Sequence, residues 1–148
     1  MSRDVMLALY DATRALTDKT LALMPEEKAE YRPVPEVFSF RQLGRHVIST
    51  ELSLIEAWPE GKFVWQNRYN DENLPTLAAV QKALPEATRT FRAWVEARTE
   101  AELAAPVRGL GEATLEQAIL EWILHEAHHR GQMCTYLREN GIVPPRSY

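Results

Sequence analysis

The sequence contains a single cysteine, Cys134, among its 148 residues. An intrachain disulfide is therefore excluded, and so is a structural zinc site built mainly from cysteine thiolates. A chain without disulfides is typical of a reducing compartment, and we expect a cytoplasmic protein. Cys134 lies among apolar neighbours at helical spacing, which favours a small packed hydrophobe over a catalytic thiol.

Long apolar runs and basic clusters are also missing. The longest apolar stretch, residues 118–124, contains Glu121 and is much shorter than the roughly 18 residues of a membrane helix. Residues 1–16 include Asp4, Asp11 and Arg14, which a signal peptide would not carry in its apolar core. Lysine and arginine are scattered, and the formal net charge is −4. We therefore expect no membrane partner and no nucleic-acid partner.

No stretch alternates convincingly between polar and apolar residues, so no sheet is expected. Helix signals are abundant instead. Capping boxes begin at Ser39, Thr99 and Thr114, and Ser2 and Thr76 are further N-cap candidates. The predicted long helices span about 2–24, 39–58, 76–98 and 114–140.

Proline, glycine and asparagine separate these helices. Pro59 ends the second helix, and a polar loop follows from Glu60 to Asn73. Pro85 is expected to kink the third helix, and Asn140-Gly141 stops the last one. With 45% hydrophobic residues, the chain has the composition of a globular protein. We predict an all-α fold, an antiparallel four-helix bundle, with residues 1–148 forming a single domain.

The last predicted helix carries HEAHHRGQ at residues 125–132. His125 and His129 are four residues apart, so both imidazoles can reach one metal ion from the same helix face. The same stripe holds Ala118, Glu121, Trp122, Gln132, Met133 and Tyr136. His128 lies to the other side of His125 and is interpreted as a residue at the edge of the bundle.

His125, Glu126 and His129 also satisfy H-E-x-x-H, the zinc-protease pattern in which the glutamate is the general base. A protease needs a third ligand and a groove for an extended peptide. The only acidic residue after His129 is Glu139, on the same predicted helix, and no strand is available to align a peptide. We therefore interpret the match as largely accidental, and a role for Glu126 as base is doubtful.

His46, on the second predicted helix, is the best candidate for a third ligand. It shares a stripe with Leu43, Thr50, Ser53, Leu54 and Ala57. Three histidines on two helices would leave one to three coordination positions open, as in catalytic metal sites. Thr50 and Gln132, each about one turn from a predicted ligand, are candidate pocket residues. A buried structural role for all these histidines is the alternative.

The other side of the last helix is apolar and carries Leu120, Ile123, Leu124, Ala127, Gly131 and Cys134. This helix therefore has two sides to bury. One should face the bundle interior and the other a neighbouring helix or a second subunit, with Gly131 allowing close approach. We expect a homodimer.

Three segments, taken in order, resemble the DinB-like (YfiT-like) metalloenzyme superfamily. They are residues 24–33 (MPEEKAEYRP), residues 39–47 (SFRQLGRHV) and residues 125–132 (HEAHHRGQ), the last closed by residues 136–145 (YLRENGIVPP). The resemblance implies a four-helix bundle and a divalent metal held by His46, His125 and His129. It also implies a frequent dimer and, in some relatives, the use of a low-molecular-weight thiol such as bacillithiol or mycothiol on small electrophiles.

Three functional hypotheses follow. The first is a metal-dependent transferase or hydrolase of small molecules, with thiol S-transfer as the favoured chemistry. The second is a protein that binds or senses a metal or ligand without turnover, and the third is a structural bundle. Three histidines suit zinc, nickel, iron(II) or copper about equally, so neither the metal nor the substrate follows from the sequence.

Overall fold

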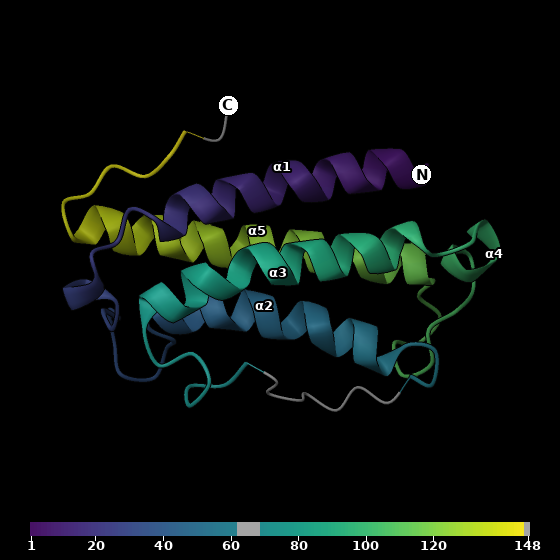
Figure 1. Cartoon of the computed structure of the whole chain (residues 1–148), viewed down its shortest axis with the longest axis horizontal. Coiled ribbons are helices and arrows are strands. Elements are labelled where there is room, and N and C mark those ends of the chain that lie inside the picture. The colour runs from purple at the N-terminus through teal and green to yellow at the C-terminus, as the bar shows by residue number, and fades with distance from the viewer. Residues whose placement is uncertain (62–68, 147–148) are drawn as a thin grey trace.

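The computed structural model describes residues 1–61 and 69–146, and helices dominate that part of the chain (Figure 1). Residues 62–68 of the predicted polar loop lie outside the described residues. Four long helices, a single-turn helix and a short 3-10 helix are present: α1 (Arg3–Leu21), η1 (Glu26–Lys28), α2 (Phe40–Ala57), α3 (Leu77–Glu96), α4 (Glu100–Leu103) and α5 (Leu115–Glu139). The described residues form no strand, and the all-α prediction is confirmed.

The helix boundaries follow the predicted capping residues. Ser39, Thr99 and Thr114 each form a complete capping box, in which the side chain three residues later returns a hydrogen bond. At the other end of α5, Gly141 adopts a φ of 74°. Its amide and that of Ile142 donate to the carbonyl oxygens of Arg138 and Leu137, the pairing of a Schellman motif.

One helix end differs from the prediction, and one helix contains an internal proline. The first helix ends at Leu21, three residues before the predicted end at Met24, and residues 22–24 form a turn. Helix α3 runs through Pro85, the position at which a kink was predicted. A proline removes one backbone donor, and packing of the helix on both sides of it can compensate for that loss.

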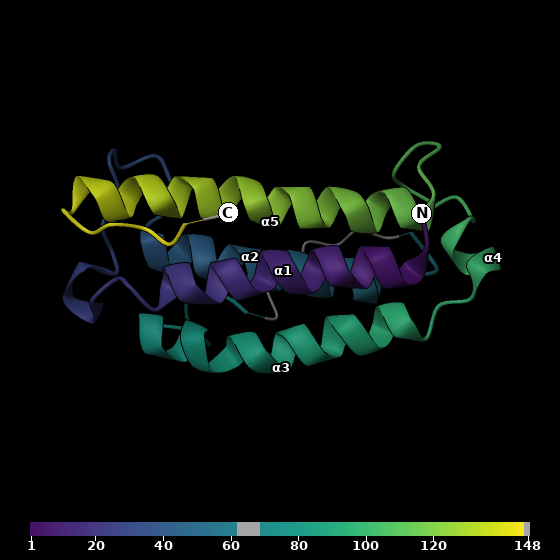
Figure 2. The ribbon, with the colours of Figure 1, turned by 90° about the horizontal axis from the view of Figure 1, so that it is seen from above.

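The long helices are arranged in two parallel pairs. Each long helix packs on two others, in the cyclic order α1, α5, α2, α3. Helices α1 and α5 run in one direction, while α2 and α3 run in the other (Figure 1). Seen from above, α5 and α3 lie on opposite sides of the bundle, with α1 and α2 between them at different depths (Figure 2). The consecutive helices α2 and α3 are therefore parallel.

The interior consists of two apolar clusters, one towards each end of the bundle. The first contains Phe40, Leu43 and Ile48 of α2 with Met133 and Leu137 of α5. The second gathers around α1, α3 and the first half of α5, and it includes Met6, Tyr10, Phe91, Leu115 and Ile119. Between the two lies a set of polar groups, described below, that ties the helices together.

Gly44 permits a close approach at the first cluster. A Cβ at this position would lie 2.7 Å from Cδ2 of Leu21 and 3.1 Å from Cγ1 of Val80. A Cβ here would force the Leu21 side chain to move, so glycine favours the close packing of α2 against the end of α1 and the start of α3.

The two predicted faces of α5 have different environments. On the side opposite the histidines, Ile123 is buried, but Leu124 is 66% exposed and Gly131 is also exposed. This side borders α1, where Val5 and Leu9 are exposed as well. No helix in the part of the chain that the structure describes combines the length and the apolarity that a membrane span requires.

Candidate metal centre

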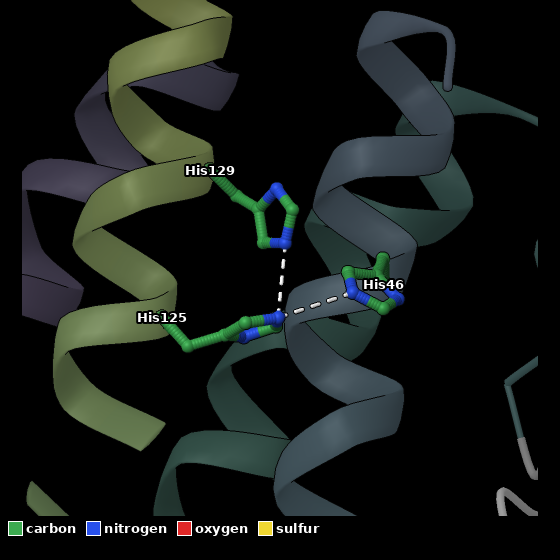
Figure 3. A group of neighbouring side chains, drawn as sticks. All are labelled: His46, His125 and His129. Carbon is green, nitrogen blue, oxygen red and sulfur yellow. Dashed lines mark hydrogen bonds between the residues drawn. The ribbon is translucent and has the colours of Figure 1, made fainter. Parts of the chain in front are cut away.

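Three imidazoles meet in the groove between α2 and α5 (Figure 3). His46 comes from α2, while His125 and His129 are one turn apart on α5. Nε2 of His125 lies 3.3 Å from Nε2 of His46 and 3.0 Å from Nε2 of His129. The structure thus brings together the three residues that the sequence predicted as ligands, and all three rings are only partly buried.

These separations fit nitrogen atoms that share one cation. With metal–nitrogen bonds of about 2.1 Å, two ligand nitrogens lie about 3.0 Å apart at right angles and about 3.4 Å apart at the tetrahedral angle. Both short contacts also end on the same atom, Nε2 of His125. A neutral imidazole nitrogen carries either one proton or one lone pair, so it cannot form two linear hydrogen bonds here. One cation would satisfy all three lone pairs, and the donor set therefore fits a metal.

Gln132 sets the orientation of one ring. Its Oε1 accepts a hydrogen bond of 2.7 Å from Nδ1 of His129. This contact places the proton of the neutral ring on Nδ1 and leaves the lone pair of Nε2 directed at the other two histidines. A partner of this kind, one step behind a ligand, is common in metal sites and tunes the affinity.

The surroundings of the histidines favour their neutral form. Burial, followed by repulsion from the neighbouring imidazoles, lowers the pKa of both His46 and His125 to about 4. Burial also lowers the pKa of His129, although its hydrogen bond to Gln132 opposes this shift. Neutral imidazoles are the form that binds metals, so the rings are ready for a cation at ordinary pH without losing protons.

Comparisons with known proteins now bear on this fold and this site. A sequence model of the DinB superfamily matches residues 9–133. The chain belongs to the DinB superfamily. A DinB-like protein of Bacillus subtilis (YjoA) has a similar structure, with a TM-score of 0.77, 22% identity, and 96% of each chain covered. A DinB-like protein of Bacillus cereus has a TM-score of 0.79 at 17% identity, with 97% of this chain and 95% of that chain covered. A sequence search of curated proteins gives no match.

In this DinB-superfamily chain, two cavities border the histidines. One, of about 130 Å³, is lined by Thr50, Glu121, Trp122 and His125. Nε1 of Trp122 donates a hydrogen bond of 2.6 Å to the carbonyl oxygen of Thr50, so this cavity lies where α5 is pinned to α2. The Thr50 hydroxyl donates to the carbonyl oxygen of His46, within its own helix. Thr50 therefore shapes the cavity wall rather than offering a free hydroxyl group.

The second cavity lies on the His129 side and measures about 220 Å³. Its lining includes Val37 and Phe38 from the segment before α2, together with Gln132 and Tyr136 from α5. The Phe38 ring packs on the His46 ring, with 5.1 Å between their centroids. Both predicted pocket residues, Thr50 and Gln132, thus lie beside the histidines, one in each cavity.

The structure also shows why Glu126 is unsuited to act as a base. It is 1% exposed, and its carboxylate accepts hydrogen bonds of 3.0 Å and 2.9 Å from Nε and Nη2 of Arg14 on α1. Its side chain is therefore directed into the bundle and held there. His128 is exposed, and its ring packs beside the His129 ring at 5.0 Å between centroids, consistent with the predicted position at the edge of the bundle.

Sequence analysis missed the partners of Glu126, which are Arg14 and Glu51. A signal for them was nonetheless present. Glu51 stands at a helix position whose neighbours three and four residues away are all apolar: Val47, Ile48, Leu54 and Ile55. A carboxylate at such a position indicates a buried ionic partner, because isolated buried charges are too costly.

Proposed function

We propose that the protein is a metal-dependent enzyme for small molecules, in which His46, His125 and His129 hold one divalent cation. The observation that carries the proposal is the meeting of three imidazoles, each offering one ring nitrogen within 4.8 Å of the other two, beside two cavities. Three protein ligands leave coordination positions for a reactant, which distinguishes a catalytic site from a closed structural one. Zinc, nickel and iron(II) all suit this ligand set.

The favoured chemistry is S-transfer from a low-molecular-weight thiol such as bacillithiol or mycothiol. A bound cation would lower the pKa of the thiol and so favour the nucleophilic thiolate. In the reaction, the sulfur forms a bond to an electrophilic carbon, the leaving group departs with its electron pair, and the thiol proton passes to solvent. The two cavities would hold the reactants on either side of the histidines, with Trp122 against one reactant and Phe38 against the other.

Metal analysis tests the site. Protein purified without an affinity tag is loaded with zinc or nickel and dialysed, and the bound metal is counted for wild type, His46→Ala and His129→Ala. We expect one ion per chain in the wild type and substoichiometric metal in both variants. Asn140→Ala, far along α5 from the group, is a suitable control for the handling of the protein. Stoichiometric binding by both histidine variants would contradict the proposed site.

Turnover is tested separately. Metal-loaded protein is incubated with bacillithiol, mycothiol or glutathione and a generic electrophile, and loss of free thiol is followed over time. We expect at least one thiol to react faster than it does with the metal-free His125→Ala variant. Equal rates for all thiols would instead favour a metal-binding protein without S-transfer activity, and an ester substrate in place of the electrophile then tests for a hydrolase.

We also infer a homodimer formed through the outer edge of α1 and α5. Val5, Leu9 and Leu16 lie at spacings of four and seven on α1, and Leu16 shares a cavity with Ala127 and Cys134 of α5. Together with Leu124, which is 66% exposed, they form an apolar strip that a second copy could cover symmetrically. Light scattering at micromolar concentration should give twice the chain mass, and Leu124→Asp should reduce it to the monomer. A monomeric wild type would contradict this inference.

A further inference from the structure

All four long helices meet at the guanidinium group of one residue, Arg14. Arg14 itself comes from α1, and its Nη2 donates both to Oε1 of Glu51 on α2 and to Oε2 of Glu126 on α5. Its Nε also donates to Glu126, and its Nη1 donates a hydrogen bond of 3.1 Å to the Thr88 hydroxyl on α3. The three charged residues are each at most 4% exposed. We call Arg14, Glu51 and Glu126 the central cluster.

The central cluster lies at the level of the three histidines. Glu126 directly follows His125 on α5, and Glu51 is five residues after His46 on α2. At a rise of about 1.5 Å per residue, these offsets along the helix axes are about 1.5 Å and about 7.5 Å. Arg14 therefore links the two helices that supply the histidines, close to where the imidazoles meet.

A second contact holds α2 to α5 on the groove side. Nε1 of Trp122 donates to the carbonyl oxygen of Thr50, one residue before Glu51. The helix pair is thus held from the interior by Arg14 and from the groove by Trp122. With both contacts in place, neither helix can slide or rotate freely relative to the other, and the separation of His46 from His125 is set.

Stability alone is a poor explanation for the central cluster. Desolvating three charges costs several kcal/mol per ion in general, and apolar replacements of such clusters are often neutral or stabilising. The alternative benefit is geometric, because the planar guanidinium group donates hydrogen bonds only in fixed directions. Burial raises the pKa of Glu51, an effect that Arg14 opposes and Glu126 reinforces, so the arrangement is not one that minimises electrostatic cost.

We propose that Arg14 is a positioning residue for the metal centre, acting through Glu51 and Glu126 to hold α2 and α5 at the spacing that the three-histidine site requires. This inference rests on the proposed metal function. Arg14 touches neither the histidines nor a reactant, and its effect is on the geometry and affinity of the metal site.

The experiment measures cobalt(II) binding and folding separately. The visible absorption spectrum of bound Co²⁺ reports coordination geometry, a titration gives its Kd, and urea unfolding of the metal-free protein gives stability. The principal variant replaces the cluster by unbranched apolar residues: Arg14→Met, Glu51→Met and Glu126→Met together. It removes all three charges at once, so none is left buried and unpaired.

We expect the triple variant to stay folded and to show a changed Co²⁺ spectrum. Its affinity for Co²⁺ should fall by about 10- to 100-fold, as it does when residues that support metal ligands are replaced. Glu51→Gln, which keeps an oxygen acceptor for Arg14, should retain more affinity than Glu51→Met. Val95→Ala, in the apolar cluster around α1 and α3, is the matched control for destabilisation. It should unfold at lower urea concentration with an unchanged cobalt spectrum.

The outcomes separate the two proposals. A wild type that binds no Co²⁺ overturns the proposed function itself. A wild type that binds Co²⁺, with a triple variant of equal affinity and identical spectrum, overturns only the positioning role of Arg14. If the triple variant fails to fold, Arg14→Lys replaces it. Its compact ammonium keeps the charge without the fork, so wild-type affinity and spectrum in folded Arg14→Lys likewise overturn the inference.

Discussion

The three histidines and the central cluster both join α2 to α5, but they differ in every physical respect. The histidines are neutral, partly buried and border two cavities, and no protein group could satisfy all three Nε2 atoms together. The central cluster is charged, almost fully buried and hydrogen-bonded across four helices. The three histidines have lone pairs available for a cation, whereas the charged groups of the central cluster already have hydrogen-bond partners within the protein.

This difference shows how a small bundle separates function from architecture. Ligand residues must keep lone pairs free, and therefore cannot also hold the helices together. The neighbouring residues perform that task, since Glu126 directly follows His125 yet is directed into the interior. Single substitutions in the two groups should therefore differ in their effect on the metal-free protein: loss of one histidine should leave its folding stability nearly unchanged, whereas loss of one charge from the central cluster should lower it.

The largest expected effect is on stability. Arg14→Met leaves Glu51 and Glu126 buried together without their cation, and removing one partner from a buried pair costs about 3–5 kcal/mol. Urea unfolding of the metal-free protein should show a loss of this size. Arg92→Met, which removes a partly exposed ion pair between α3 and α1, is the control and should cost much less. Equal losses in the two variants would show that the central cluster contributes no more to folding stability than a partly exposed ion pair.

His125→Ala should have the opposite signature. Its Nε2 contacts both other histidines, so its removal breaks the ligand set. We expect metal affinity to fall by more than about 100-fold, which corresponds to about 2.7 kcal/mol. The stability of the metal-free protein should change by less than about 1 kcal/mol, because the ring is only partly buried. A competition titration with a chromophoric chelator measures the affinity. A large loss of stability without metal would show that the histidines are structural.

Gln132→Leu sharpens the contrast by leaving all three ligands in place. The hydrogen bond that fixes the His129 ring is lost, and metal affinity should fall by about 10- to 100-fold. Gln132→Glu, which retains an oxygen acceptor at the same position, should bind more tightly than Gln132→Leu. The same chelator competition measures both variants, and an unchanged affinity in Gln132→Leu would remove this glutamine from the site.

A further prediction concerns pH. Because burial lowers the pKa of His46 and His125 to about 4, the unfolded chain takes up protons between about pH 6.5 and 4 that the folded chain does not. The free energy of unfolding of the metal-free protein should therefore fall as pH decreases through this window. His125→Ala should flatten the slope in urea unfolding at pH 7, 6 and 5. A variant with the wild-type slope would assign the dependence to other groups.

The lowered pKa values of His46 and His125 also change the pH dependence expected for metal binding. With the usual pKa of about 6.5, proton competition for the ligands would begin near neutral pH. In the folded protein, the lowered pKa of His46 and His125 moves this competition towards pH 4. Metal affinity should thus be nearly constant from about pH 8 to about pH 6 and weaken below that range.

Local signals in the sequence predicted the helices and two of the three histidines of the candidate metal site. Capping boxes at Ser39 and Thr114 determine where α2 and α5 begin, because they satisfy backbone groups within a few residues. The spacing of His125 and His129 likewise needs nothing beyond the helix itself. These features depend only on residues that are close together in the chain, so they can be recognised in the sequence.

Contacts across the bundle were decided by tertiary packing. The sequence suggested His46 as a partner for the α5 pair, but its distance from His125 depends on how α2 lies against α5. The parallel course of α2 and α3 and the inward direction of Glu126 were likewise not predicted. Arg14 meets Glu51 and Glu126 across 37 and 112 residues of sequence. Such pairings form only where burial makes an unpaired charge too costly, and burial is a property of the folded chain.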